Sequence, residues 1–230
     1  MVRKYTPFMI LPALVIAVVL LLVANGTNAT PSGEKRALII VSEYDGSNQY
    51  EVNKAAAYYD HLIEEGFSSE NMVFLCMSDH PDKDGNSSLS NVESSFKDLI
   101  DDSSNQDDVR IYVSDNVHVI NSDTHYQFSG GQLPCNNVIG WVEEMKFSSL
   151  DYLNLGNHSG LFGRELAGPN RVIISSMREY EETPKDKFDI TRGYDDPNAD
   201  TNGDGTVSTE EAFYSERIRL EGTDQTPIMW

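Results

Sequence analysis

Positively charged residues are scarce in this sequence. Its 230 residues include 17 Lys and Arg against 37 Asp and Glu, which gives a formal net charge of −20 at pH 7. A chain of this charge repels the phosphate backbone of nucleic acids and acidic membrane surfaces. We therefore exclude nucleic-acid binding, and we expect a surface that suits solubility and the binding of cations.

Cysteine is nearly absent as well, since the chain contains two, Cys76 and Cys135. Neither lies in the spacing of a zinc site, which argues against zinc as a cofactor. The two thiols could form one disulfide in an oxidising compartment, and the sequence leaves that pairing open.

A long apolar run occurs at the N-terminus. The basic start Met1–Lys4 precedes an uncharged run from Tyr5 to Asn25. This pattern is typical of a signal peptide or an uncleaved anchor within residues 1–30, and the small residues after the run favour cleavage. We expect residues 31–230 to form one extracytoplasmic domain, which is secreted or is held at the membrane by that segment alone.

The body of the chain alternates predicted strands with predicted helices. Short apolar runs predict buried strands at Arg36–Val41, Met72–Cys76, Val109–Ser114, Leu150–Leu155 and Val172–Ser175. Apolar residues at helical spacing predict helices in Tyr50–Ile63, Val92–Ile100, Val138–Phe147 and Leu161–Leu166. We expect an extension at Val119–Ile120 and Tyr126–Phe128, and a solvated loop in the charged segment Met177–Arg192. This alternation predicts an α/β fold, with a mainly parallel sheet and helices on both faces.

The most specific motif, residues 200–211, matches a full twelve-residue EF-hand calcium loop. The predicted Ca²⁺ ligands at positions 1, 3, 5, 7, 9 and 12 are Asp200, Asn202, Asp204, Thr206, Ser208 and Glu211. Gly205 supplies the sharp turn at position 6. Pro197 interrupts any helix before the loop, and the sequence has no second loop to pair with it. We therefore expect a structural calcium ion rather than a calcium sensor.

Function is expected just beyond the strand Val109–Ser114, because ligands of open α/β sheets bind at the carboxyl ends of the strands. The segment Asp108–Asp115 resembles the strand that ends in the catalytic Ser-Asp-His-Gly of legumain-type cysteine endopeptidases. Leu155–Phe162 resembles their Asp-Ala-Cys-x-Ser-Gly-x-Phe segment, and Gln225–Pro227 resembles a Gln-Thr-Pro of their exported prokaryotic, mostly archaeal, members. The resemblance implies a caspase-like three-layer sandwich over residues 31–230.

Both residues of the family's catalytic dyad are replaced in this chain. By the resemblance, the His that abstracts the thiol proton falls at Asn116, and the Cys nucleophile falls at Asn157. An amide is neither a base nor a useful nucleophile near neutral pH. Val117 replaces a Gly beside the site and should narrow it. The sequence thus predicts a non-catalytic relative that binds a peptide or a partner protein in the old active-site crevice.

Two alternatives remain open. In the first, the chain is an active hydrolase with a relocated dyad, in which His118 or His158 activates Ser159. A displacement by two residues moves a side chain by roughly 6–7 Å, so this dyad would not inherit the old geometry. In the second alternative, the chain is a calcium-stabilised surface domain without a ligand in the crevice.

Overall fold

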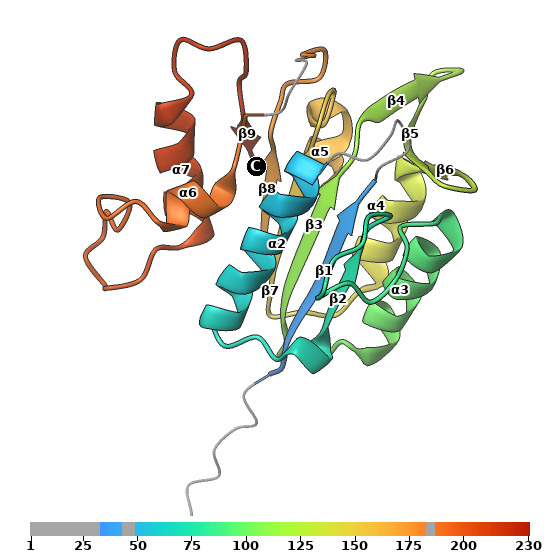
Figure 1. Cartoon of the computed structure of the whole chain (residues 1–230), viewed down its shortest axis with the longest axis horizontal. Coiled ribbons are helices and arrows are strands. Elements are labelled where there is room, and N and C mark those ends of the chain that lie inside the picture. Colours follow the sequence, from blue (N-terminus) through green and yellow to red (C-terminus); the bar gives the residue numbers. More distant parts are fainter. Residues whose placement is uncertain (1–32, 43–48, 183–186) are drawn as a thin grey trace, which may run out of the picture. The chain divides into compact units, whose positions relative to one another are not determined.

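The computed structural model describes residues 33–42, 49–182 and 187–230, and the predicted leader lies outside these ranges. Six strands form the main sheet, in the order β2-β1-β3-β7-β8-β9 (Figure 1). All pairs are parallel except the last, in which β9 runs antiparallel to β8. The bounds are Lys35–Val41 for β1, Met72–Leu75 for β2, Asp108–Ser114 for β3, Ser149–Leu155 for β7, Arg171–Ser175 for β8 and Ile228–Met229 for β9. The predicted α/β class and mainly parallel sheet are confirmed.

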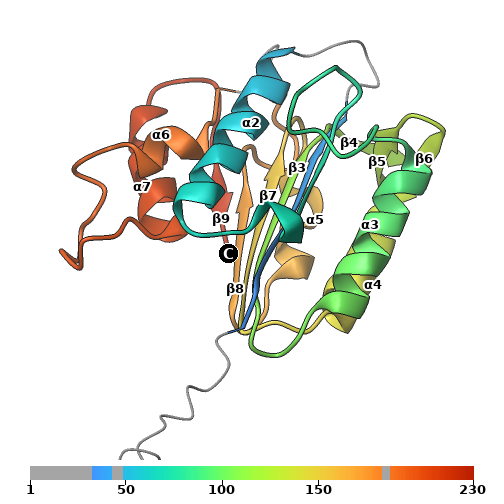
Figure 2. The same cartoon turned by 60° about the horizontal axis from the view of Figure 1, so that its bottom comes forward.

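Helices cover both faces of this sheet, which gives a helix–sheet–helix arrangement in three layers (Figures 1 and 2). One face carries α3 (Leu89–Asp102), α4 (Cys135–Glu144) and α5 (Gly160–Leu166). The other face carries α2 (Gln49–Glu64), α6 (Ile190–Tyr194) and α7 (Thr209–Arg219). A short 3-10 helix, Ser69–Asn71, precedes β2. No helix in the described part of the chain has the length and apolar character needed to cross a bilayer.

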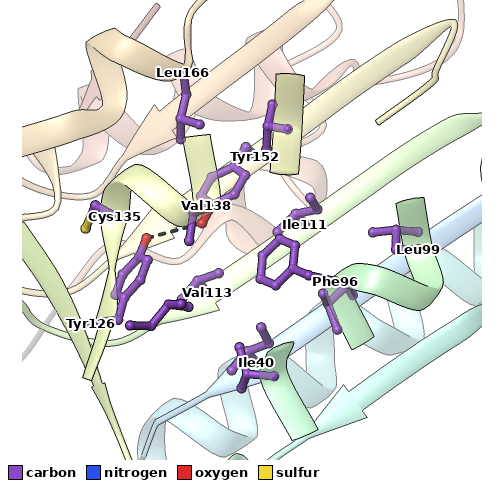
Figure 3. Close-up of a cluster of buried hydrophobic side chains, with 14 of the residues drawn as sticks. Ile40, Phe96, Leu99, Ile111, Val113, Tyr126, Cys135, Val138, Tyr152 and Leu166 are labelled. Atoms are coloured by element: carbon purple, nitrogen blue, oxygen red, sulfur yellow. Dashed lines mark hydrogen bonds between the residues drawn. The ribbon is translucent and has the colours of Figure 1, made fainter. Parts of the chain in front are cut away.

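The central strand β3 contributes to a separate apolar cluster on each face. Ile111 and Val113 are buried under α3 and α4, in the cluster that Figure 3 shows. Tyr112 points to the opposite face and stacks on Tyr58 of α2, with ring centroids 5.2 Å apart. Successive strand side chains alternate between faces, so the central part of a strand buried on both faces carries a continuous apolar run, here Ile111–Val113.

A small antiparallel sheet follows β3. It contains β4 (Val117–Ile120), β5 (Asp123–Phe128) and β6 (Gly131–Pro134). The expected extension is therefore a separate three-stranded sheet, and β6 was not predicted. Asn121 and Ser122 join β4 to β5 with φ angles of 53° and 74°, which are those of a two-residue type I′ hairpin turn.

The structure also decides the open question of the disulfide and corrects the expectation for the charged segment. Cys76 and Cys135 are both buried, in clusters on opposite faces of the sheet, so they form no disulfide with each other. The charged segment Met177–Arg192 is not solvated throughout, because Phe188 and Ile190 are buried and Ile190 begins α6. Residues 183–186 of this segment lie outside the described ranges.

Candidate functional site

The candidate site lies where β3 and β7 end side by side. Ser114 and Leu155 are register partners at these ends, and the N–H of Asp115 donates to the carbonyl of Leu155 over 2.9 Å. Gly156 follows with a φ of 123°, and a Cβ built on it would lie 2.4 Å from the carbonyl oxygen of Asp115. Glycine is therefore required here, because the two loops approach too closely for a side chain.

Beyond this glycine, the structure brings the two predicted dyad positions together. The N–H of Asn157 donates to the side-chain Oδ1 of Asn116 over 2.9 Å. The carbonyl of Asn157 in turn accepts from the N–H of Val117 over 2.9 Å. The two loops are thus joined through Asn116 and Asn157, and the carboxamide of Asn116 has a structural partner.

His118 belongs to a different surface. Val117 is fully buried at the start of β4, and His118 is the next residue of that strand. Because strand side chains alternate, His118 projects from the opposite face of the small sheet. Its register partner there is His125 of β5, on the small sheet rather than on the loop that follows β7.

Ser159 is buried in the loop after β7. Its Oγ accepts a hydrogen bond from the N–H of Met177 over 3.1 Å and lies 3.4 Å from the carbonyl of Met177, to which it donates. A serine nucleophile needs a base within hydrogen-bond reach and access to substrate. This hydroxyl is instead bonded to the backbone that follows β8.

His158 is held by the glutamates of the charged segment. Its Nε2 lies 2.7 Å from Oε1 of Glu182, and its Nδ1 lies 3.2 Å from the carbonyl oxygen of Glu179. Its own N–H donates to the carbonyl of Glu181 over 3.2 Å. Sequence reasoning missed this contact, because the glutamates lie 21 and 24 residues after His158 and no local pattern links them to it.

Buried polar side chains form a hydrogen-bond network next to the candidate site. Tyr126 donates to Oδ1 of Asn154 over 2.7 Å, and Nδ2 of Asn154 donates to the carbonyl of Ser159 over 2.6 Å. The hydroxyl of Tyr126 also lies 3.3 Å from that of Tyr152, the contact dashed in Figure 3. Burial raises the pKa of both phenols, so they remain neutral donors. The network fixes the loop that carries Asn157.

The predicted calcium loop folds around its own carboxylates. Asp200 accepts from the N–H groups of Gly203 and Gly205, over 2.7 and 3.0 Å. Gly205, at position 6, has a φ of 90°, which suits the sharp turn that this position requires. In the same way, Asn202 accepts from Asp204 N–H and Asp204 accepts from Thr206 N–H.

Glu211 closes this loop. One of its oxygens accepts from the N–H of Thr201 and of Asn202, over 2.9 and 3.1 Å, and the other accepts from Ser208 N–H over 3.0 Å. These hydrogen bonds, that from Ser208 first, lower the pKa of Glu211 to about 2. Within the ranges that the structure describes, no three His, Cys, Asp or Glu side chains form a metal-binding group.

A second polar cluster lies at the opposite end of the sheet, and sequence reasoning missed it. Asp151 of β7 is buried, forms an ion pair with Arg110 of β3 at 3.2 Å, and accepts from the hydroxyl of Thr209 at the start of α7. Arg110 also pairs with Asp108. Arg110, Asp151 and Thr209 border a cavity of about 430 Å³. Charged residues inside two apolar strand runs were the available signal.

No family model matches the chain, and none of the curated proteins matches it.

Proposed function

We propose that this chain is an exported, non-catalytic relative of the legumain-like cysteine peptidases, with a caspase-like fold. In this proposal it recognises a peptide or protein segment in the crevice at the ends of β3 and β7 and does not cut it. The observation that carries the proposal is the direct hydrogen bond between Asn157 and Asn116, over 2.9 Å. The two positions that the resemblance assigns to nucleophile and base are neighbours, and both hold amides.

The chemistry of these amides argues against catalysis. A carboxamide cannot take a proton from a nucleophile near neutral pH, and it does not attack a peptide carbonyl. It can donate and accept hydrogen bonds, which is what recognition of a peptide backbone requires. A pair of half-buried amides at the ends of β3 and β7 is therefore suited to binding.

The relocated dyad gains no support from the contacts of its members. Ser159 is buried with its hydroxyl on Met177, and His158 faces Glu182. A serine that attacks a substrate must have its oxygen exposed to that substrate and hydrogen-bonded to a base.

The proposal includes a structural calcium ion in the loop formed by residues 200–211. The side chains of Asp200, Asn202, Asp204 and Glu211, with the Thr206 carbonyl and Ser208, would hold the ion, because a hard cation takes six to eight oxygen ligands. Their oxygens face the interior of a loop whose carboxylates accept several N–H groups, and Glu211 stays ionised to a pH of about 2. The ion would supply charge neutralisation and would clamp the loop to the start of α7.

Turnover of a fluorogenic peptide library by the full chain, with and without calcium, tests the absence of catalysis. We expect no cleavage in either condition. Cleavage that persists through repurification and disappears in Ser159→Ala would refute the non-catalytic assignment and establish the relocated dyad.

Binding of the same peptides, measured by fluorescence polarisation, tests recognition. The variant Asn157→Arg should no longer bind a peptide that the full chain binds, because the long arginine side chain would fill the proposed crevice. Asn136→Arg, on the exposed side of α4, is the matched control and should bind normally. If no peptide binds, or if both variants bind alike, the crevice is not the recognition site.

Calorimetric titration with CaCl₂ tests the metal. We expect one site per chain, with a dissociation constant of at most about 1 mM, the weak end for extracellular modules. Glu211→Gln should weaken the affinity for Ca²⁺ by at least tenfold, because the substitution removes one of the two carboxylate oxygens that would bind the ion. Glu221→Gln, on the exposed turn after α7, should leave that affinity unchanged. Equal titrations of the two variants would exclude this loop as the site.

A further inference from the structure

The strand β9 forms an open edge of the main sheet in the described part of the chain. Trp230, directly after β9, exchanges both backbone hydrogen bonds with Ile173 of β8, over 2.9 and 3.1 Å. Residues of an antiparallel strand alternate between facing the partner and facing away. Met229, the register partner of Ile174, therefore directs its N–H and C=O toward the open edge. Such an edge is a template for an added strand.

A pocket of about 250 Å³ lies against this edge. Its walls include Phe213, Tyr214 and Arg217 of α7, Ile228 and Met229 of β9, and Arg178 after β8. Tyr214 is half exposed, while Phe213 is buried behind it. Drug-sized ligands occupy about 300–1,000 Å³, so this β9 pocket fits one or two side chains rather than a whole small molecule.

The charge of the β9 pocket is opposite to that of the protein. Two arginines and no acidic residue line it, in a chain with a net charge of −20. The ion pairs of the described residues involve other arginines and leave Arg178 and Arg217 without an acidic partner. The neighbouring carboxylate of Glu181 accepts instead from the backbone N–H groups of Arg178 and Thr226.

We propose that the β9 pocket binds an extended acidic segment of a partner protein. The segment pairs with the backbone of Met229 as an added strand, places a carboxylate on Arg178 and Arg217, and lays an apolar side chain on Tyr214. Guanidinium groups bind carboxylates through paired hydrogen bonds, and strand addition supplies main-chain affinity while alternate side chains give specificity. This surface shares no residue with the Asn116–Asn157 crevice and does not depend on its function.

A fluorescein-labelled hexapeptide of alternating valine and glutamate is the probe, with valine–glutamine and valine–lysine peptides for comparison. In polarisation titrations of the full chain, we expect the glutamate peptide to bind at least tenfold more tightly than either. The field of an acidic protein favours the lysine peptide, so this order requires a local cationic site. The double variant Arg178→Gln/Arg217→Gln should bind the glutamate peptide about tenfold more weakly, because the substitutions remove two exposed charge pairs.

Two controls make the test specific. Arg164→Gln, on the exposed surface of α5, removes a charge outside the pocket and should leave the affinity unchanged, as should Asn157→Arg in the crevice. Strand addition uses one edge of the peptide, so N-methylation of the valines or of the glutamates should abolish binding in one of these two probes and spare the other.

Equal affinity for the three peptides, or equal affinity of the double variant and Arg164→Gln, would overturn the proposal. Binding that survives N-methylation on both edges would refute strand addition. If the full chain sediments as a dimer that Arg178→Gln/Arg217→Gln dissociates, the occupant is a second copy of this chain and the assigned partner is wrong.

Discussion

The ionisation of Asp151 should make the protein less stable as the pH rises from 4 to 7. This carboxyl is buried between β3 and α7, close to Arg110 and Asp108 of β3, Tyr194 of α6 and Glu210 of α7. Burial raises its pKa from 3.8 to about 6, although Arg110 and the hydroxyl of Thr209 act in the opposite direction. Unfolding releases the carboxyl into water, where its pKa returns to the ordinary value.

The direction and the size of this change in unfolding free energy follow from proton linkage. Between pH 4 and 6 the unfolded chain loses the proton of Asp151 while the folded chain retains it, so proton binding favours the folded state there. The stabilising contribution is complete below pH 4 and is lost as the pH passes 6. A rise of roughly two pKa units corresponds to about 3 kcal/mol of unfolding free energy, at about 1.4 kcal/mol per unit.

The matched variant is Asp151→Asn, which keeps the shape of the side chain and removes its titration. Urea unfolding of both proteins at pH 4, 5, 6 and 7 gives the difference in unfolding free energy at each pH. The wild type should lose about 2.4 kcal/mol relative to the variant across this range, because at pH 4 part of the unfolded chain has already lost the proton of Asp151. Other carboxyls titrate in both proteins and cancel in the difference. A difference that is constant with pH, or that changes in favour of the wild type, would refute the burial argument.

Three further outcomes test the candidate site. Gly156→Ala should lower the unfolding free energy by about 2 kcal/mol or more, because its φ of 123° and its closeness to the opposite loop exclude a Cβ; a melting temperature equal to wild type would contradict this. Tyr126→Phe should cost about 1–3 kcal/mol in chemical denaturation, since it leaves Oδ1 of the buried Asn154 without this donor; no loss would mean that the network is redundant. The double variant Asn116→His/Asn157→Cys should react with iodoacetamide at pH 6.5 about tenfold faster than Asn157→Cys alone, because an adjacent imidazole lowers the thiol pKa; equal rates would show that the two positions are not arranged as a dyad.

Most strands of the main sheet could be predicted from the sequence, but few of the structural elements around the sheet could. Apolar runs such as Leu150–Leu155 have a single stable placement, buried on both faces, and each became a strand. The pairing of Asn116 with Asn157 came from the family resemblance, and the structure places the two residues in hydrogen-bond contact at the ends of β3 and β7.

Elements that tertiary contacts hold were not predictable. β9 contains two residues and exists through its pairing with β8, and α6 contains five residues anchored by the buried Ile190. Local patterns do not signal such short elements. The separation of Cys76 from Cys135 depends on which face of the sheet α4 covers, and this depends on the order of the strands rather than on local sequence.

The contacts of Ser159 bear both on the relocated dyad and on the order of the loop that carries Asn157. Its carbonyl accepts from Asn154 and from Ser175 over 2.6 and 3.0 Å, and its hydroxyl bonds to the backbone of Met177. The residue therefore joins β7, β8 and the network beneath them. To serve as a nucleophile, its hydroxyl would have to leave Met177 and expose a buried position, at the cost of unsatisfied polar groups. The same contacts hold the Asn157 loop in one arrangement at the ends of β7 and β8. A fixed shape with amide donors and acceptors is what a recognition site needs, and this favours binding over hydrolysis at these strand ends.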